Sequence, residues 1–340
     1  MPSFAQELRS AVTARAAVLV IGALVLQLAF IASYVGAFHN PRPKDVALGV
    51  VAPQAIGAQV TERLAGLPGD PLEPRTVSGG EAAAVAKIRE RDLDAALVVE
   101  PRGTTDTLLV AGGAGASLAQ ATEAVLIRAE AAEGRKVRVK DVAPAAAGDA
   151  RGLTSFYLVV GWCVGGYLCA AILAISAGAR PANPHRAVIR LGALALYSAA
   201  AGLLGTVIAG PVLDALPGGV LGLWGLGTLV VFAVGATTLA LQGLAGIVGI
   251  GLAIAIVVVL GNPSAGGAYP YPLLPPFWNA IGPALPPGAG TWSARSLAYF
   301  HGNGLTGPLL VLSAWAVAGT AVTMVCATFR RREPEGTAGR

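Results

Sequence analysis

The long, almost uncharged stretch in the second half of the chain constrains its fold more than any other feature. Only five charged residues lie between Leu153 and Phe329, and residues 219–261 carry none. A helix needs about 20 apolar residues to cross the hydrocarbon core of a bilayer. The chain is also only 13% charged, whereas soluble domains carry about 25% charged residues. The sequence therefore predicts a polytopic α-helical membrane protein.

Six segments are apolar enough to be transmembrane helices. The first is longer than the apolar region of a typical signal peptide, so we expect it to be retained as a span. Six spans place both termini on one side, and every basic cluster beside a span then falls on that side, as the positive-inside rule requires. We therefore expect cytoplasmic termini. The expected spans are 16–37, 156–177, 191–213, two spans within 219–261 that divide near Gln242, and 305–328.

The region between the first two spans has a different composition. Between His39 and Gly152 there are 14 Lys and Arg and 15 Asp and Glu residues, and strand-like and helix-like patterns alternate. We expect a small extracytoplasmic α/β domain here. Its strands are expected at 45–53, 73–79, 93–100, 105–113 and 135–143, and its helices at 54–66, 80–92 and 117–134. The predicted organisation is a cytoplasmic amphipathic helix (1–15), the first span (16–37), the α/β domain (38–154), a five-helix membrane domain (155–329) and a cytoplasmic tail (330–340).

A proline-rich and aromatic-rich segment precedes the last span. YPYPLLPPFWNAIGPALPPGAGTW (269–292) holds seven prolines and five aromatic residues. Proline breaks helices, and irregular backbone at membrane depth survives only against protein or a water-filled cavity. We interpret residues 262–304 as a plug or re-entrant cap on the outer mouth of the bundle; the alternative is an interfacial loop that only anchors the chain. The residues expected to form the cap are Pro275, Pro276, Phe277, Trp278, Pro286, Trp292, Arg295 and Tyr299.

Motifs for enzymatic chemistry are not found in the sequence. The glycine-rich AGGAGAS (111–117) lacks the Lys-Ser/Thr ending of a phosphate-binding loop, so we expect a turn before a helix there. No Cys/His cluster has metal-ligand spacing, and no serine has an evident His/Asp partner. We expect no enzyme activity, no cofactor and no metal. The cores of the expected spans carry no Asp, Glu, Lys, Arg or His, and ion-coupled carriers need such groups. Uphill transport would then need energy from another chain.

The order of these segments resembles the type-2 permeases of ABC exporters. The residues that carry the resemblance are YVGAFHNPRPKDVALGVVAP (34–53), LTSFYLVVGWCVGGYLCAAIL (153–173) and LLPPFWNAIGPALPPGAGTWSARSLAYFHGNG (273–304). The layout is most similar to the phage-infection-protein (YhgE/Pip) branch, although the outer domain is shorter than the helix-rich insertion of many members. The resemblance implies a homo- or heterodimer of permease subunits served by a separate cytosolic ATPase.

In such exporters a cytoplasmic loop between the second and third spans docks on the ATPase. Here that loop is ARPANPHRAVIR (179–190), and its basic residues either pair with acidic ATPase residues or only set topology and contact anionic lipid. The residues expected to dock are Arg180, Asn183, His185, Arg186 and Arg190.

Two functions are consistent with the sequence. The first is a permease subunit in a bacterial plasma membrane that exports an amphipathic or lipid-like compound. The second is a non-transporting envelope protein (a secretion accessory, receptor or scaffold) that acts through its outer domain. No nucleic-acid partner is expected, because the charged region itself has a net charge of −1 (14 − 15).

Overall fold

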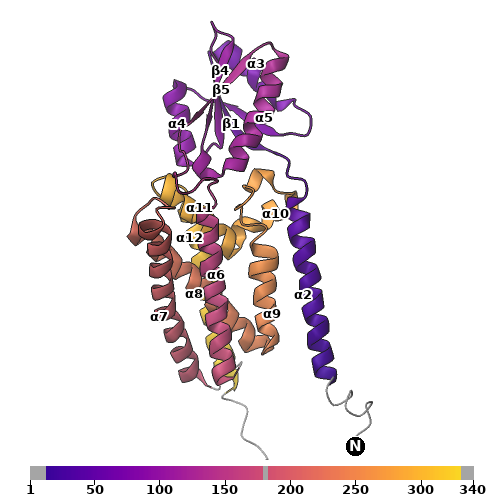
Figure 1. The fold of residues 1–340 in the computed structure, drawn as a ribbon, viewed down its shortest axis with the longest axis vertical. Coiled ribbons are helices and arrows are strands. Elements are labelled where there is room, and N and C mark those ends of the chain that lie inside the picture. Colours follow the sequence, from indigo (N-terminus) through magenta and orange to yellow (C-terminus); the bar gives the residue numbers. More distant parts are fainter. Residues whose placement is uncertain (1–12, 179–182, 331–340) are drawn as a thin grey trace, which may run out of the picture.

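The computed structural model describes residues 13–178 and 183–330. A small α/β domain sits on one end of a helical bundle, and helix α2 runs beside the bundle (Figure 1). The expected amphipathic helix at 1–15 and the tail at 330–340 lie outside the described residues, except for positions 13–15 and 330.

Five helices in the described part of the chain are long and apolar enough to cross a membrane. The protein is therefore a polytopic helical membrane protein, as the hydropathy pattern predicts. These helices are α2 (Ala14–Phe38), α6 (Thr154–Ala177), α7 (Pro184–Val207, continued by the π-helix η2, Ile208–Val212), α8 (Val220–Ala245) and α12 (Thr306–Arg330).

The remaining expected span is shorter than a membrane is thick. It consists of α9 (Val248–Ile254) and the π-helix η3 (Ala255–Gly261). Fourteen helical residues span about 21 Å, against about 30 Å for a hydrocarbon core. The turn that separates α8 from α9 lies at Gly246, four residues after the predicted position. Six crossings therefore remain a prediction.

Helix α8 is the centre of the bundle, because α6, α7 and α12 all pack against it. Glycines bring the backbones close at each of these contacts. A Cβ on Gly166 of α6 would lie 2.6 Å from the Val231 oxygen, and one on Gly202 of α7 would lie 2.6 Å from the Thr228 nitrogen. Small residues at helix crossings are typical of packing in a membrane, where close van der Waals contact drives association.

Helix α2 stands apart from this bundle and is mostly exposed. Its contact lies near its end, where the Ser33 hydroxyl donates to the Val259 carbonyl of η3. Phe38 at the end of α2 lies 5.5 Å from Tyr269, measured between ring centroids. The apolar surface of α2 is consequently free to face lipid.

The α/β domain contains the five expected strands and three expected helices. Its sheet has the order β2-β1-β3-β4-β5. Neighbouring strands are parallel except for β3 and β4, which are antiparallel and follow each other across a short turn. The elements are β1 (Val46–Val51), α3 (Gln54–Ala65), β2 (Leu72–Thr76), α4 (Gly80–Glu90), β3 (Ala95–Val98), β4 (Thr105–Val110), the short 3-10 helix η1 (Gly112–Ala114), α5 (Ala116–Ala132) and β5 (Lys136–Asp141).

Alternate residues of the strands fill two hydrophobic clusters, one on each face of the sheet. Leu48 and Leu108 belong to the cluster under α3 and α5, whereas Leu109 belongs to the cluster under α4. Each cluster also takes a residue from the segment before the last span: Leu273 enters the first and Phe300 the second. Side chains from the membrane half of the chain therefore complete both hydrophobic cores of the α/β domain.

Candidate functional site

The segment 262–304, here called the cap, is more regular than its prolines suggest. The expectation of irregular backbone was wrong over α11, and the reason is the position of the prolines. Pro276 and Pro286 each occupy a first helical position, where the missing N–H removes no hydrogen bond and the fixed φ suits a helix. The cap contains η4 (Tyr271–Leu273), α10 (Pro276–Ile281), η5 (Gly282–Ala284) and α11 (Pro286–Tyr299).

Helix α11 is embedded in one end of the bundle, against α6, α8 and α12. Ten of its 14 residues are buried. Two glycines allow close approaches here, Gly290 to α6 and Gly288 to η5 of the cap itself. A Cβ on Gly288 would lie 2.1 Å from the Gly282 carbonyl oxygen, and one on Gly290 would lie 2.7 Å from Val159 Cγ1. The cap is thus part of the bundle rather than a loop lying over it.

Arg295 of α11 ties three chain segments together. Its side chain is 3% exposed. Nη1 donates to the Gly266 carbonyl at 2.6 Å, and Nη2 donates to the carbonyls of Gly267 at 2.8 Å and Gly152 at 3.1 Å. Gly152 belongs to the connection between the α/β domain and α6. Nε has no hydrogen-bond partner among the described residues, so the Nε–H of this buried cation stays without an acceptor there.

Arg91 reaches the same helix from the α/β domain. It follows α4 in a left-handed conformation, with φ 66°. Nη1 donates to the Trp292 carbonyl at 2.9 Å and to Ser296 Oγ at 2.6 Å. The guanidinium carbon lies 3.4 Å from the centroid of the Trp292 ring, an arrangement in which the ring face attracts the cation. Arg91 therefore fastens the α/β domain to α11.

Asp149 and Tyr299 make a third polar link. The Tyr299 hydroxyl donates to Asp149 Oδ2 at 2.7 Å. Asp149 Oδ1 accepts from both the backbone nitrogen and the hydroxyl of Thr154, at 2.9 Å each. Asp149 is 3% exposed, and Thr154 is the first residue of α6. The start of α6 and the end of α11 are held at a fixed separation by this carboxylate.

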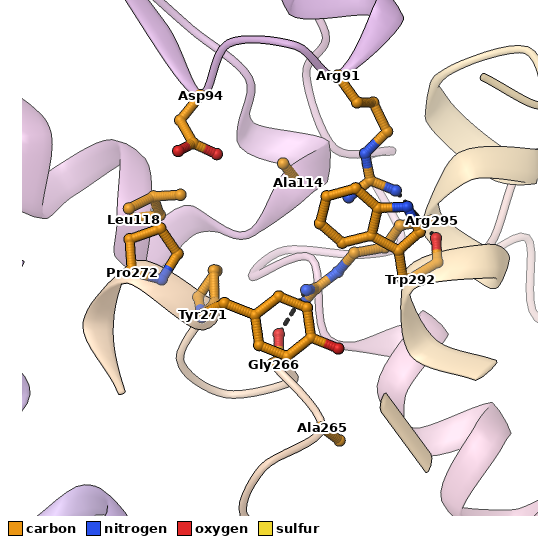
Figure 2. Close-up of a pocket in the computed structure, with 11 residues that line it drawn as sticks. Arg91, Asp94, Ala114, Leu118, Ala265, Gly266, Tyr271, Pro272, Trp292 and Arg295 are labelled. Carbon is orange, nitrogen blue, oxygen red and sulfur yellow. Dashed lines mark hydrogen bonds between the residues drawn. The ribbon is translucent and has the colours of Figure 1, made fainter. Parts of the chain in front are cut away.

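A small polar cavity lies where these links meet, between the α/β domain and the cap. Its volume is about 30 Å³. In Figure 2 the Asp94 carboxylate lies on one side of the opening and Arg91 with Trp292 on the other, while Tyr271 and Arg295 lie below them. The residues that line it are Arg91, Asp94, Ala114, Leu118, Ala265, Gly266, Pro270, Tyr271, Pro272, Trp292 and Arg295.

The charges in the cavity are unusual because neither arginine forms an ion pair with a carboxylate in the described residues. Asp94 Oδ2 instead accepts the backbone N–H of Ala47 at 3.1 Å. Burial raises the pKa of Asp94. Burial, together with the nearby charge of Arg295, lowers the pKa of Arg91. Both shifts indicate that the cavity removes Asp94 and Arg91 from water without placing an oppositely charged group of the described residues within ion-pair distance of either.

A larger apolar groove adjoins the cavity. Its volume is about 550 Å³. Tyr271 and Trp292 line both spaces, and their stacked rings are 6.0 Å apart. The two aromatic side chains thus separate a polar compartment from an apolar one. The groove is lined by Tyr271, Pro283, Ala289, Trp292, Gly304, Thr306, Gly307, Pro308 and Val311.

The remaining residues expected in the cap have simpler positions. Pro275 precedes α10 as its N-cap. Phe277 is exposed, and its ring meets that of Trp278 edge-on at 5.0 Å. Neither residue lines the cavity or the groove. Of the expected cap residues, only Trp292, Arg295 and Tyr299 take part in the links described above.

The described part of the expected docking loop, residues 183–190, lies at the end of the bundle opposite the α/β domain (Figure 1). Most of it is helical, which corrects the prediction of a loop: Pro184 opens α7, and Asn183 Oδ1 accepts the Arg186 backbone N–H at 2.9 Å. His185 and Arg186 are exposed. Arg190 is 5% exposed and donates to the Gly178 carbonyl. Arg180 lies outside the described residues.

Sequence reasoning missed Arg91, Asp94 and Asp149. Arg91 and Asp94 lie in a charged helix–strand connection, and no spacing relates either to α11, some 200 positions away. Only Asp149 offers a signal, as a lone acid five residues before the start of α6. In the described residues no group of three or more His, Cys, Asp or Glu side chains is arranged to hold a metal ion.

Comparison of the chain with models of protein families, with curated proteins and with solved structures returned no match.

Proposed function

We propose that the protein is the membrane permease subunit of an ABC-type exporter, which moves an amphipathic or lipid-like substrate outward with energy from a separate ATPase subunit. The α/β domain and the cap then face the outside of a bacterial plasma membrane, and both termini are cytoplasmic. Subunits of this kind work as homo- or heterodimers. Six crossings are completed by the short α9–η3 helix and the start of the cap.

The observation that carries the proposal is that α11 belongs to both halves of the chain. Its body is packed among bundle helices, and Phe300 directly after it fills a core cluster of the α/β domain. Arg91 and Asp149 add polar links between the same two halves. A movement of the bundle would therefore be transmitted to the outer domain, as a permease driven from its opposite end requires.

The far end of the bundle offers a surface for the ATPase. His185 and Arg186 are exposed there, at the start of α7. Arg190 donates to the carbonyl of Gly178, the residue directly after α6, so α7 begins at a fixed position relative to α6. Because α7 packs against α8, a movement of α7 caused by ATPase binding to its basic surface would be transmitted to α8 at the centre of the bundle.

The test is co-purification of an ATPase with the full-length protein from its native membranes in mild detergent. The proposal expects a nucleotide-hydrolysing subunit in stoichiometric amount. Arg186→Glu should reduce its recovery by roughly tenfold, because a charge reversal replaces attraction by repulsion. Arg151→Glu is the matched control: Arg151 is also exposed but lies beside the α/β domain, so its reversal should not change recovery. Absence of any ATPase from the wild-type complex would contradict the proposal.

The second candidate is a non-transporting envelope protein that acts through its outer domain. One observation favours it: an open groove of about 640 Å³ between α3 and α5 is lined by Arg42 and Arg128, and by Arg63, which pairs with Glu130 at 2.7 Å and lies 3.9 Å from Glu133 of the same groove. A partner with an acidic surface would bind there. If this candidate is right, cells that carry Arg128→Glu should resemble cells that lack the protein. Cells that carry Arg186→Glu should resemble the wild type.

A further inference from the structure

The polar cavity and the apolar groove meet at one pair of side chains. Tyr271 and Trp292 line both spaces, and their stacked rings, with centroids 6.0 Å apart, leave no gap for a chain, so a molecule that occupies both spaces must displace one of the two rings. The polar end of such a molecule would lie against Arg91 and Arg295, and its apolar end would lie along the first turns of α12.

The cavity presents more donors than acceptors. Its lining residues carry two positive charges, on Arg91 and Arg295, and one negative charge, on Asp94. Arg295 Nε is buried without a partner among the described residues. Both hydrogen bonds of Arg91 described above use Nη1, which leaves Nε and Nη2 free to donate. A carboxylate accepts such bonds with two oxygens and matches the planar fork of a guanidinium.

The two volumes restrict the shape of the ligand. A water molecule needs about 10–15 Å³ of such space, so the 30 Å³ cavity admits a group of a few atoms. A carboxylate fits this limit, whereas a glycerophosphate head group exceeds it. The groove, at about 550 Å³, lies within the range of about 300–1,000 Å³ that is common for small-molecule sites, and its lining residues carry no charge.

We propose that the cavity and groove together form one binding site for a single-chain amphiphile with a carboxylate head. The head lies between Arg91 and Arg295, and the chain lies in the groove beside Gly307 and Val311. The inference deepens the proposed function by naming a substrate class, and it rests on that function only in treating the ligand as cargo.

The probe is radiolabelled palmitate, added to the full-length protein in nanodiscs of zwitterionic phosphatidylcholine. Saturable binding of one palmitate per chain is expected. Unlabelled palmitate should displace it, and hexadecanol, which has the same chain without the charge, should not. Arg91→Gln should weaken binding by roughly tenfold or more, because it removes a charged hydrogen-bond donor to the carboxylate.

A second variant blocks the groove without disturbing the cap. A Cβ on Gly307 meets no atom within 4 Å, so Gly307→Leu has room to fold and places its side chain in the groove. We expect it to weaken palmitate binding at least tenfold. Gly192→Leu is the matched control, since Gly192 is also a helical glycine with open space and lies outside the groove.

Three results would overturn the inference: no saturable binding, equal displacement by hexadecanol, or binding that neither Arg91→Gln nor Gly307→Leu weakens. Its failure is distinguishable from that of the proposed function. An ATPase that co-purifies with a protein that binds no palmitate removes the carboxylate site alone. Palmitate binding without any ATPase removes the exporter and leaves the site.

Discussion

Replacing Arg295 by glutamine tests whether the cap holds the two halves of the chain together. The substitution removes a buried cation and its three bonds, to the carbonyls of Gly152, Gly266 and Gly267. Each hydrogen bond from a charged donor contributes about 1.5–3 kcal/mol, and the three are not additive because they share one side chain. Glutamine can keep one of them. We expect the free energy of unfolding to fall by about 3–5 kcal/mol.

Thermal unfolding in detergent can be followed with a thiol-reactive dye in a background where the partly exposed Cys169 and Cys326 are replaced, because the remaining Cys163 is 1% exposed and becomes reactive only when the bundle opens. For domains of 150–250 residues, 1 kcal/mol lowers the melting temperature by about 2–4 °C, so Arg295→Gln should lower it by about 6 °C or more. Arg151→Gln removes an exposed arginine nearby and should leave it unchanged. A shift for Arg295→Gln as small as that of this control would refute the assigned role.

Three further predictions concern the same junction. Phe300→Ala should lower the free energy of unfolding by about 3–5 kcal/mol, measured by the same thermal assay, because Phe300 is 1% exposed within a core cluster of the α/β domain. Gly282→Ala should prevent correct folding of the cap, judged by the yield of monodisperse protein, since its Cβ would lie 2.0 Å from the Ser264 carbonyl oxygen; Gly251→Ala, whose Cβ meets no atom within 4 Å, should give the wild-type yield. Burial raises the pKa of Asp94, so the folded protein keeps a proton that the unfolded chain loses, and stability should fall as pH rises from about 4. Asp94→Asn should flatten that decline in a series of melting temperatures from pH 4.5 to 7.5, and a decline as steep as that of the wild type would contradict the assignment.

The sequence predicted the features that depend on local composition. Uncharged apolar runs are enough to locate α2, α6, α7, α8 and α12, because the bilayer selects for length and hydropathy. The strands and helices of the α/β domain were predicted within a few residues for a similar reason, since a buried sheet alternates its apolar residues. The position of the turn before α9 was also close to the prediction.

Features that depend on contacts between distant segments were not predictable in this way. The prolines of the cap indicate irregular backbone, but Pro276 and Pro286 stand at helix starts, which depends on where the chain turns. Arg91 resembles any exposed charge on a soluble helix until α11 is placed beside it. Arg295 was identified as a cap residue, but its three carbonyl partners are known only from the fold.

The most direct test of the account is the side of the membrane on which the α/β domain and cap lie. In a variant whose three cysteines are replaced, single cysteines would be introduced at Glu90 in the α/β domain and at Arg186 at the start of α7, both of which are exposed. A membrane-impermeant maleimide is then applied to intact cells. We predict that Glu90→Cys is labelled in intact cells and that Arg186→Cys is labelled only after lysis. Labelling of Arg186→Cys in intact cells, with Glu90→Cys protected, would contradict it.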